Sequence, residues 1–275
     1  MSTEILRYAA FTDTPDGGNP AGVVLDASGL DDAAMQAIAA DVGYSETAFV
    51  TAADGADLTV RYFSPLAEVP FCGHATIATG VAWGDRHGDG LLKLTTPAGL
   101  VEVDVAAGVA TLTSVAPSTG PLDDADLDEL LGALGWSRAD LDPELPPRVG
   151  YAGAHHPVLG AARSERLADL AYDFERLGAI MAERDWTTVQ LVWRQDRLRF
   201  HSRNPFPPGG VVEDPATGAA AAALGTYLRE LGHVEPPATV TVIQGEDMGR
   251  PGRLLVDLHA DRPEIDVTGT AIAIS

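Results

Sequence analysis

Two short glycine motifs in this sequence have the residue types needed to bind a small anion. One is Cys72-Gly73-His74, the other is Thr217-Gly218, and each opens a run of small apolar residues that predicts a buried helix. The first N–H groups of a helix have no partner within it, and the helix dipole adds partial positive charge there. Each motif alone is equally typical of a plain helix cap. Two of them facing each other across a cleft would hold a small carboxylate.

The numbers of cysteine and lysine residues exclude several kinds of site. Cys72 is the only cysteine, so neither an intramolecular disulfide nor a zinc site built on cysteine pairs can form. We interpret it first as a small buried loop residue. Lys93 is the only lysine, and its alternating surroundings predict a strand that points it outward. This placement argues against Schiff-base and pyridoxal phosphate chemistry, which need a lysine in a cleft.

The adjacent histidines His155 and His156 could suggest a metal pair. Neighbouring residues on a strand point to opposite faces, and no carboxylate cluster with helical ligand spacing accompanies them. We expect His155 at the surface and treat His156 as a candidate for lining the cleft. The sequence therefore predicts no metal and no cofactor, and loss of activity on chelation would overturn that prediction.

The predicted elements follow the same order in both halves of the chain. A strand over 57–64 leads through a proline-containing loop to the first motif and to an apolar helix over about 74–83. A strand over 198–202 leads through a proline- and glycine-rich loop to a second apolar helix over 219–231, and two strands follow. The alternative is two unrelated segments, but the shared order favours an internal duplication. We predict an α+β fold with two pseudo-symmetric lobes, each a curved sheet around one small-residue helix.

The length agrees with two lobes, because 275 residues at roughly 150 per domain make about two. The segment 116–121, rich in proline, serine and glycine, is typical of a linker. We expect an N-terminal lobe over 1–116 and a C-terminal lobe over 117–262. A last strand at about 263–275 is expected to return to the N-terminal lobe.

The composition restricts the partners. Eighteen basic and 40 acidic residues give a net charge of 18 − 40 = −22, which repels nucleic acid and anionic membranes. The 45% hydrophobic content is enough for an ordinary core. No signal-peptide pattern and no apolar stretch of roughly 18 residues is visible. We expect a cytoplasmic protein that binds neither nucleic acid nor membranes.

Several stretches, in order along nearly the whole chain, resemble a known family. They are Gly18-Asn19-Pro20-Ala21-Gly22-Val23-Val24, Ser45-Glu46-Thr47-Ala48-Phe49, Val69-Pro70-Phe71-Cys72-Gly73-His74-Ala75-Thr76, Glu213-Asp214-Pro215-Ala216-Thr217-Gly218, and the stretch from Gln244 to Gly252. Together they are similar to the PhzF-like proteins, the phenazine-biosynthesis-type isomerases. The resemblance implies the diaminopimelate-epimerase-like fold: two pseudo-symmetric, β-barrel-like lobes with central helices and a site between them. It also implies a homodimer.

The resemblance implies a role for each matching residue. Glu46 corresponds to the proton-shuttling glutamate, and His74 and Asp214 correspond to polar residues that hold the substrate and assist the proton transfer. Substrate contacts are further implied for positions around these residues: Asn19, Gly73, Ala75, Thr217, Gly218 and Ala219. At the last position the best-studied branch of the family has serine. Ala219 removes that hydroxyl donor, which puts the substrate of that branch in doubt.

The predicted function is a cofactor-independent isomerase acting on a small anionic amino or hydroxy carboxylic acid. Glu46 would serve as general acid and base, since a carboxylate in a closed, partly apolar cleft has a raised pKa. A first alternative is a lyase, dehydratase or racemase that uses Cys72. Racemases of this fold pair two cysteines, and Thr217 at the matching position is too weak a base to replace a thiolate. A second alternative is a non-catalytic protein that binds a small molecule.

Overall fold

The computed structural model describes residues 3–275, which form two compact units. Unit 1 extends to Thr113 and includes Thr268–Ser275, and unit 2 is Ser114–Val267. The last strand of the chain, β17 (Ile265–Ala273), therefore contributes most of its residues to unit 1. Among the described residues, no helix combines the length and apolarity needed to cross a bilayer.

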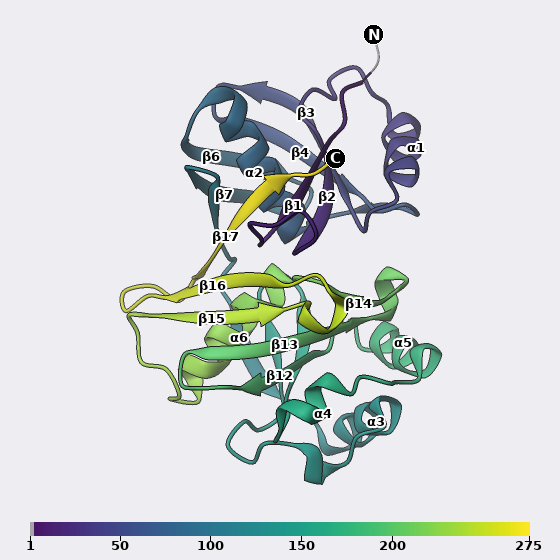
Figure 1. The fold of residues 1–275 in the computed structure, drawn as a ribbon, viewed down its shortest axis with the longest axis vertical. Helices are drawn as coiled ribbons and strands as arrows, with labels where there is room; N and C mark the ends of the chain where they lie inside the picture. Colours follow the sequence, from purple (N-terminus) through teal and green to yellow (C-terminus); the bar gives the residue numbers. More distant parts are fainter. Residues whose placement is uncertain (1–2) are drawn as a thin grey trace. The chain divides into compact units, whose positions relative to one another are not determined.

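Unit 1 is an eight-stranded closed barrel around one helix. Its strands pair in the order β1, β2, β3, β4, β6, β7, β8 and β17, and β17 pairs back with β1. Their bounds are β1 (Leu6–Ala10), β2 (Asn19–Val24), β3 (Thr47–Asp54), β4 (Asp57–Phe63), β6 (Gly90–Thr96), β7 (Gly99–Ala106) and β8 (Val109–Thr113), with a short β5 (Glu68–Val69) beside β4. Inside runs α2 (Gly73–His87), which is buried without interruption from His74 to Trp83 (Figure 1).

Small residues on α2 allow the barrel to close around it. A Cβ atom added to Gly80 would lie 3.0 Å from Cγ1 of Val103, and one added to Gly84 would lie 2.8 Å from Cγ1 of Val105. The barrel wall thus touches the helix backbone at these two positions. A second helix, α1 (Asp32–Val42), lies outside the barrel, and its Met35 joins a separate apolar cluster with residues of β3 and β4.

Unit 2 repeats the plan with an open sheet. The strands pair in the order β9, β10, β11, β12, β13, β15 and β16, and β14 pairs with the far end of β13. Their bounds are β9 (Ser118–Pro121), β10 (Arg148–Tyr151), β11 (His155–Gly160), β12 (Gln190–Arg194), β13 (Arg199–Phe206), β14 (Val211–Asp214), β15 (Ala238–Gln244) and β16 (Gly252–Leu258). Against one face packs α6 (Gly218–Glu230), with five consecutive alanines after its first glycine.

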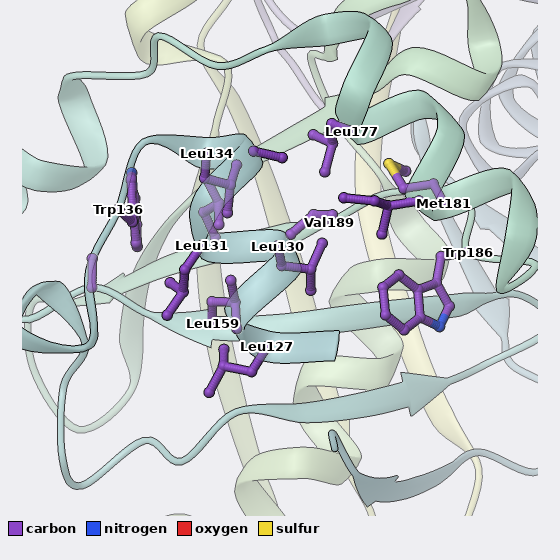
Figure 2. Close-up of a cluster of buried hydrophobic side chains, with 14 of the residues drawn as sticks. Leu127, Leu130, Leu131, Leu134, Trp136, Leu159, Leu177, Met181, Trp186 and Val189 are labelled. Atoms are coloured by element: carbon purple, nitrogen blue, oxygen red, sulfur yellow. The ribbon is translucent and has the colours of Figure 1, made fainter. Parts of the chain in front are cut away.

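The opposite face of this sheet carries a leucine-rich layer. Leu127, Leu130, Leu131 and Leu134 of α3 (Asp124–Leu134) pack with Leu177 and Met181 of α5 (Phe174–Glu183) and with Leu159 of β11 (Figure 2). A short helix α4 (Ser164–Ala168) adds Leu167. The leucine-rich layer covers this face of the sheet, and polar side chains lie on the other face, toward α6. Short 3₁₀ helices at Arg138–Asp140, Pro207–Gly209 and Glu246–Met248 complete the connections.

The predicted α+β architecture with a central helix in each half is confirmed. Lys93 points outward from β6 as predicted, between the buried Leu92 and Leu94. The linker predicted at 116–121 is wrong in its second half, because Ser118–Pro121 forms β9 and pairs with β10. Its composition is typical of a loop, but hydrogen bonds to a neighbouring strand override that local preference.

We expect Gly150→Ala to lower the free energy of unfolding by about 1–3 kcal/mol, as overpacking of a core does. A Cβ atom at Gly150 of β10 would lie 2.9 Å from the Cβ atom of Ala223 on α6. Gly120→Ala on the neighbouring strand β9 is the matched control, since nothing lies within 4 Å of a Cβ atom there. Urea unfolding measures both variants, and equal stabilities would contradict a close strand-to-helix contact at Gly150.

Candidate active site

Three side chains of unit 1 that can carry or hold a proton meet at the start of α2. The Cys72 thiol lies 3.4 Å from Oε2 of Glu46, and Nε2 of His74 lies 3.5 Å from the same oxygen. The Cys72 sulfur is also 3.3 Å from Nδ1 of His74. Cys72 and His74 are buried, and the Glu46 side chain is 12% exposed. The predicted residues Glu46, Cys72 and His74 therefore form one compact cluster.

The barrel positions this cluster by joining a strand start to a helix start. Glu46 directly precedes β3, and its carbonyl oxygen accepts a hydrogen bond from the Gly22 N–H of β2 at 3.2 Å. Glycine is required at position 22, because a Cβ atom there would lie 2.6 Å from Oγ1 of Thr47. Cys72 is the N-cap of α2 and makes no capping hydrogen bond with its side chain. The thiol therefore points to Glu46 and His74 rather than back to the helix.

A buried hydroxyl pair supports the helix start from inside. The Thr76 hydroxyl donates to the Cys72 carbonyl oxygen at 2.7 Å, so Tyr62 donates its own hydroxyl hydrogen to Thr76 at 2.7 Å. Burial raises the pKa of Tyr62, which keeps this hydroxyl protonated. Phe71 packs against the Tyr62 ring edge to face, with 5.9 Å between ring centroids. The backbone at Cys72 is thus fixed from both sides.

In unit 2 a second polar cluster surrounds the start of α6. The Thr217 hydroxyl donates to Oδ2 of Asp214 at 2.6 Å. The Gln244 side-chain amide donates to the Asp214 carbonyl oxygen at 2.7 Å and to the Thr217 hydroxyl at 3.0 Å. Its carbonyl oxygen accepts the Thr217 N–H at 3.1 Å. Asp214 and Gln244 are buried, so this amide locks the loop before α6 in one conformation.

Gln244 is a site residue that motif-based reasoning did not single out. It ends β15 and is followed by Gly245, whose backbone has a positive φ of 84°. A Cβ atom at Gly245 would lie 2.3 Å from the Arg250 carbonyl oxygen and 2.8 Å from that of Pro215. The Gln-Gly pair was visible as part of the family resemblance, and a strand that ends in Gln-Gly is the local signal for it. Ser45, 3.4 Å from Nε2 of His74, was likewise overlooked beside Glu46.

The acidic residue next to Asp214 has a structural partner. Glu213 is buried and accepts from Nε of Arg203 at 2.9 Å, and the Arg203 guanidinium makes a second, shorter contact to the same carboxylate. Arg203 also donates to the Ala168 carbonyl oxygen at 2.7 Å. Glu213 is therefore neutralised within unit 2, and Asp214 is the carboxylate that faces the start of α6.

His156 lies in the interior of unit 2. It is completely buried, and its Nδ1 is 2.9 Å from the Thr188 hydroxyl. The Asn204 side chain donates to the same hydroxyl at 3.1 Å, and Asn204 pairs with Asp214 across β13 and β14. His156 pairs with Gly150, so its ring lies on the face toward α6. His155 is exposed, as predicted.

The other predicted contact residues occupy the ends of the same elements. Asn19 is buried at the start of β2. Glu46 directly precedes β3, which runs parallel to β2, so both residues lie at the same edge of this strand pair. Ala75 is buried in the first turn of α2, and Ala219 is partly exposed in the first turn of α6. Gly73 and Gly218 are the first residues of the two helices. Gly73 and Ala75 thus lie at the start of α2, and Thr217, Gly218 and Ala219 lie at the start of α6.

Comparison with known proteins gives a family match over almost the whole chain. Residues 8–275 match the profile of the family described as phenazine biosynthesis-like protein. An uncharacterised isomerase, YfhB of Bacillus subtilis, is 30% identical over 98% of this chain and 96% of its own. Trans-2,3-dihydro-3-hydroxyanthranilate isomerase of Pseudomonas fluorescens is 31% identical over 96% of this chain and 94% of its own.

A solved structure agrees with this match. The PhzF-family phenazine biosynthesis protein of Bacillus anthracis superposes with a TM-score of 0.88 at 28% identity. The alignment covers 99% of this chain and 98% of the other. The fold is therefore shared over almost the whole of both chains.

We expect the wild-type protein to lose about 2 kcal/mol more unfolding free energy than His156→Gln between pH 7 and pH 5. Burial lowers the pKa of His156 to about 3. An unfolded chain protonates histidine near pH 6.5, while the folded protein takes up no proton there until far lower pH. The stability linked to His156 is thus present above about pH 6.5 and is lost as the pH falls toward 3. Urea unfolding at several pH values measures both proteins, and parallel pH profiles would contradict a neutral buried His156.

Proposed function

This chain belongs to the phenazine biosynthesis-like family of isomerases, and from that premise we propose that it moves a proton on a small anionic amino or hydroxy carboxylic acid without a cofactor. Glu46 removes the proton from one carbon and returns it to another. The observation that carries the proposal is the contact of its carboxylate with the Cys72 thiol and the His74 imidazole at the start of α2.

The surroundings of Glu46 suit a group that both takes and gives a proton. The side chain is nearly buried, yet it keeps enough exposure, 12%, to reach a bound molecule. His74 lies 3.5 Å away and can donate to a substrate oxygen or to the carboxylate, depending on which ring nitrogen carries the hydrogen. A carboxylate placed between two hydrogen-bonding neighbours keeps its orientation through both halves of a proton transfer.

The start of the central helix in each unit offers natural donors for a carboxylate. The N–H groups of Gly73, His74 and Ala75 lie in the first turn of the 15-residue α2, and that turn contains no acidic residue of its own. Gly218 and Ala219 occupy the equivalent turn of the 13-residue α6, again without an acidic residue. Such donors also stabilise the enolate-like charge that builds up when a proton leaves the carbon beside a carboxylate.

Asp214 is proposed to hold the polar group of the substrate. Its carboxylate is oriented by the Thr217 hydroxyl, and its backbone is held by Gln244. The relative from Pseudomonas fluorescens is named for trans-2,3-dihydro-3-hydroxyanthranilate, an amino acid with a hydroxyl group. We propose a substrate of the same chemical class here. Ala219 offers no hydroxyl to it, so the substrate of that relative is not assumed.

One observation keeps a second reaction in view. The Cys72 sulfur lies 3.4 Å from Oε2 of Glu46 and 3.3 Å from Nδ1 of His74, so either group is close enough to accept the thiol proton. A lyase or racemase would use that thiol. Thr217, at the matching place in unit 2, donates its hydroxyl hydrogen to Asp214. This hydrogen bond disfavours a symmetric pair of bases. The homodimer implied by the resemblance stays a prediction that light scattering can measure.

We expect Glu46→Gln to lower the turnover rate by about 10²- to 10⁴-fold, the usual contribution of general acid–base catalysis. The assay is proton NMR in heavy water with a panel of amino and hydroxy carboxylic acids. It reports deuterium in a rearranged product. Glu102→Gln, an exposed acid on β7, is the matched control and keeps full activity. A fully active Glu46→Gln protein would rule out the assigned role.

Cys72→Ala separates the two reactions in the same assay. Under the proposed function it keeps measurable isomerisation, since Glu46 still carries the proton. Exchange at an unrearranged α-carbon, or loss of water, that disappears in Cys72→Ala would instead assign a racemase or lyase. Thermal unfolding of the variant checks that the start of α2 is intact.

A further inference from the structure

We propose that Glu46, Cys72 and His74 bind one Zn²⁺ ion and that the bound ion inhibits the isomerase. The ion is an inhibitor here and takes no part in the reaction. The inhibition rests on the proposed function of Glu46, whereas the binding itself rests only on the geometry of unit 1. The three side chains offer one sulfur, one nitrogen and one oxygen, all within 4.8 Å of one another.

The distances between the three atoms match a zinc coordination shell. Typical bond lengths of about 2.3 Å to sulfur and about 2.0–2.2 Å to nitrogen and oxygen set tetrahedral edges of about 3.4–3.6 Å. Oε2 of Glu46 lies 3.4 Å from the sulfur and 3.5 Å from Nε2 of His74. The third edge, from the sulfur to Nε2, is 3.9 Å. A small rotation of the imidazole therefore completes the shell.

The types of ligand select zinc over harder cations. Thiolate and imidazole are ligands of Zn²⁺, whereas Mg²⁺ and Ca²⁺ take oxygen ligands. Zinc replaces the proton of the Cys72 thiol, and this proton leaves to solvent. The resulting thiolate and the Glu46 carboxylate then balance the two charges of the ion. The bound ion with these two ligands therefore adds no net positive charge beside the partial positive charge at the start of α2. The net charge of −22 also favours the approach of a cation.

Three protein ligands leave a fourth position for water or for a substrate carboxylate. Because the ion would occupy Oε2 of Glu46, that carboxylate could no longer accept a proton from a substrate. Inhibition would therefore be reversible, and removal of zinc would raise the activity rather than abolish it. This sign distinguishes an inhibitory ion from a catalytic one.

Zinc affinity of the full chain, first freed of metal with a chelator, tests the binding directly. Competition with a chromophoric chelator is expected to show one tight site per chain. Cys72→Ser and His74→Gln should each weaken it at least about tenfold, since each removes one ligand. His201→Gln is the matched control: His201 contacts Glu246 at 2.8 Å in unit 2, a histidine–carboxylate pair without a thiol. Equal affinity of Cys72→Ser and wild type, or a loss confined to His201→Gln, would overturn the site.

Co²⁺ provides a readout that needs no stable variant. Bound to the wild-type protein it should give a sulfur-to-cobalt charge-transfer band, and absence of that band at full loading would exclude Cys72 as a ligand. In the heavy-water assay, zinc should suppress turnover and a chelator should restore it. Full turnover with one zinc bound would overturn the inhibition. If no substrate turns over even without metal, the proposed function fails, and the affinity and cobalt measurements still decide the site.

Discussion

The contact between a helix backbone and the sheet wrapped around it governs this molecule. At Gly80, Gly84, Gly150 and Gly225 a single added carbon atom would lie 2.8–3.0 Å from a side chain of the opposing element. Because the strands come this close, glycine, alanine and threonine occupy most of the buried positions of α2 and α6. At the positions of closest approach there is no room for a large polar side chain.

This restriction leaves the helix starts as the places where chemistry can be built. There the sheet ends, and strand-end residues such as Glu46 and Gln244 lie beside the N-cap residues Cys72 and Thr217. The two units differ in the side chains that surround the helix start. Unit 1 brings together three side chains that can exchange or hold protons, and unit 2 forms a fixed hydrogen-bond network around Asp214. The start of α2 is therefore surrounded by reactive side chains, whereas the start of α6 is held by a rigid network.

Much of this architecture could be predicted from the sequence. The runs of small apolar residues after Gly73 and Gly218 predicted both central helices, and the family resemblance singled out Glu46, His74 and Asp214. The structure adds that Glu46 and Cys72 are in direct contact although 26 residues separate them. Contacts of this kind depend on strand pairing, here of β4 with both β3 and β5, which local patterns do not encode. Gln244 was missed for the same reason, because its partners lie 27 and 30 residues away.

His156 and Ser118–Pro121 show the opposite limit. The His155-His156 pair gave no sign that the ring of His156 would be completely buried against α6. That position follows from the pairing of His156 with Gly150, which has no side chain. The segment 118–121 has the composition of a loop and still forms β9, since β10 supplies its hydrogen-bond partners. In both cases a neighbouring strand decides the outcome.

In the cluster at the start of α2, the requirements of proton transfer conflict with the avoidance of metal binding. A group that moves protons between carbons must be nearly dry, oriented, and close to other donors, and Glu46 satisfies each condition. Those same conditions place a carboxylate, a thiol and an imidazole at the mutual distances of a zinc shell. Thr217, which occupies the position of Cys72 in unit 2, offers a hydroxyl already committed to Asp214 and so carries no such conflict. Glu46 is therefore the group shared by the proposed proton transfer and the proposed zinc site, and the thiol at position 72 is what distinguishes this cluster from its counterpart in unit 2.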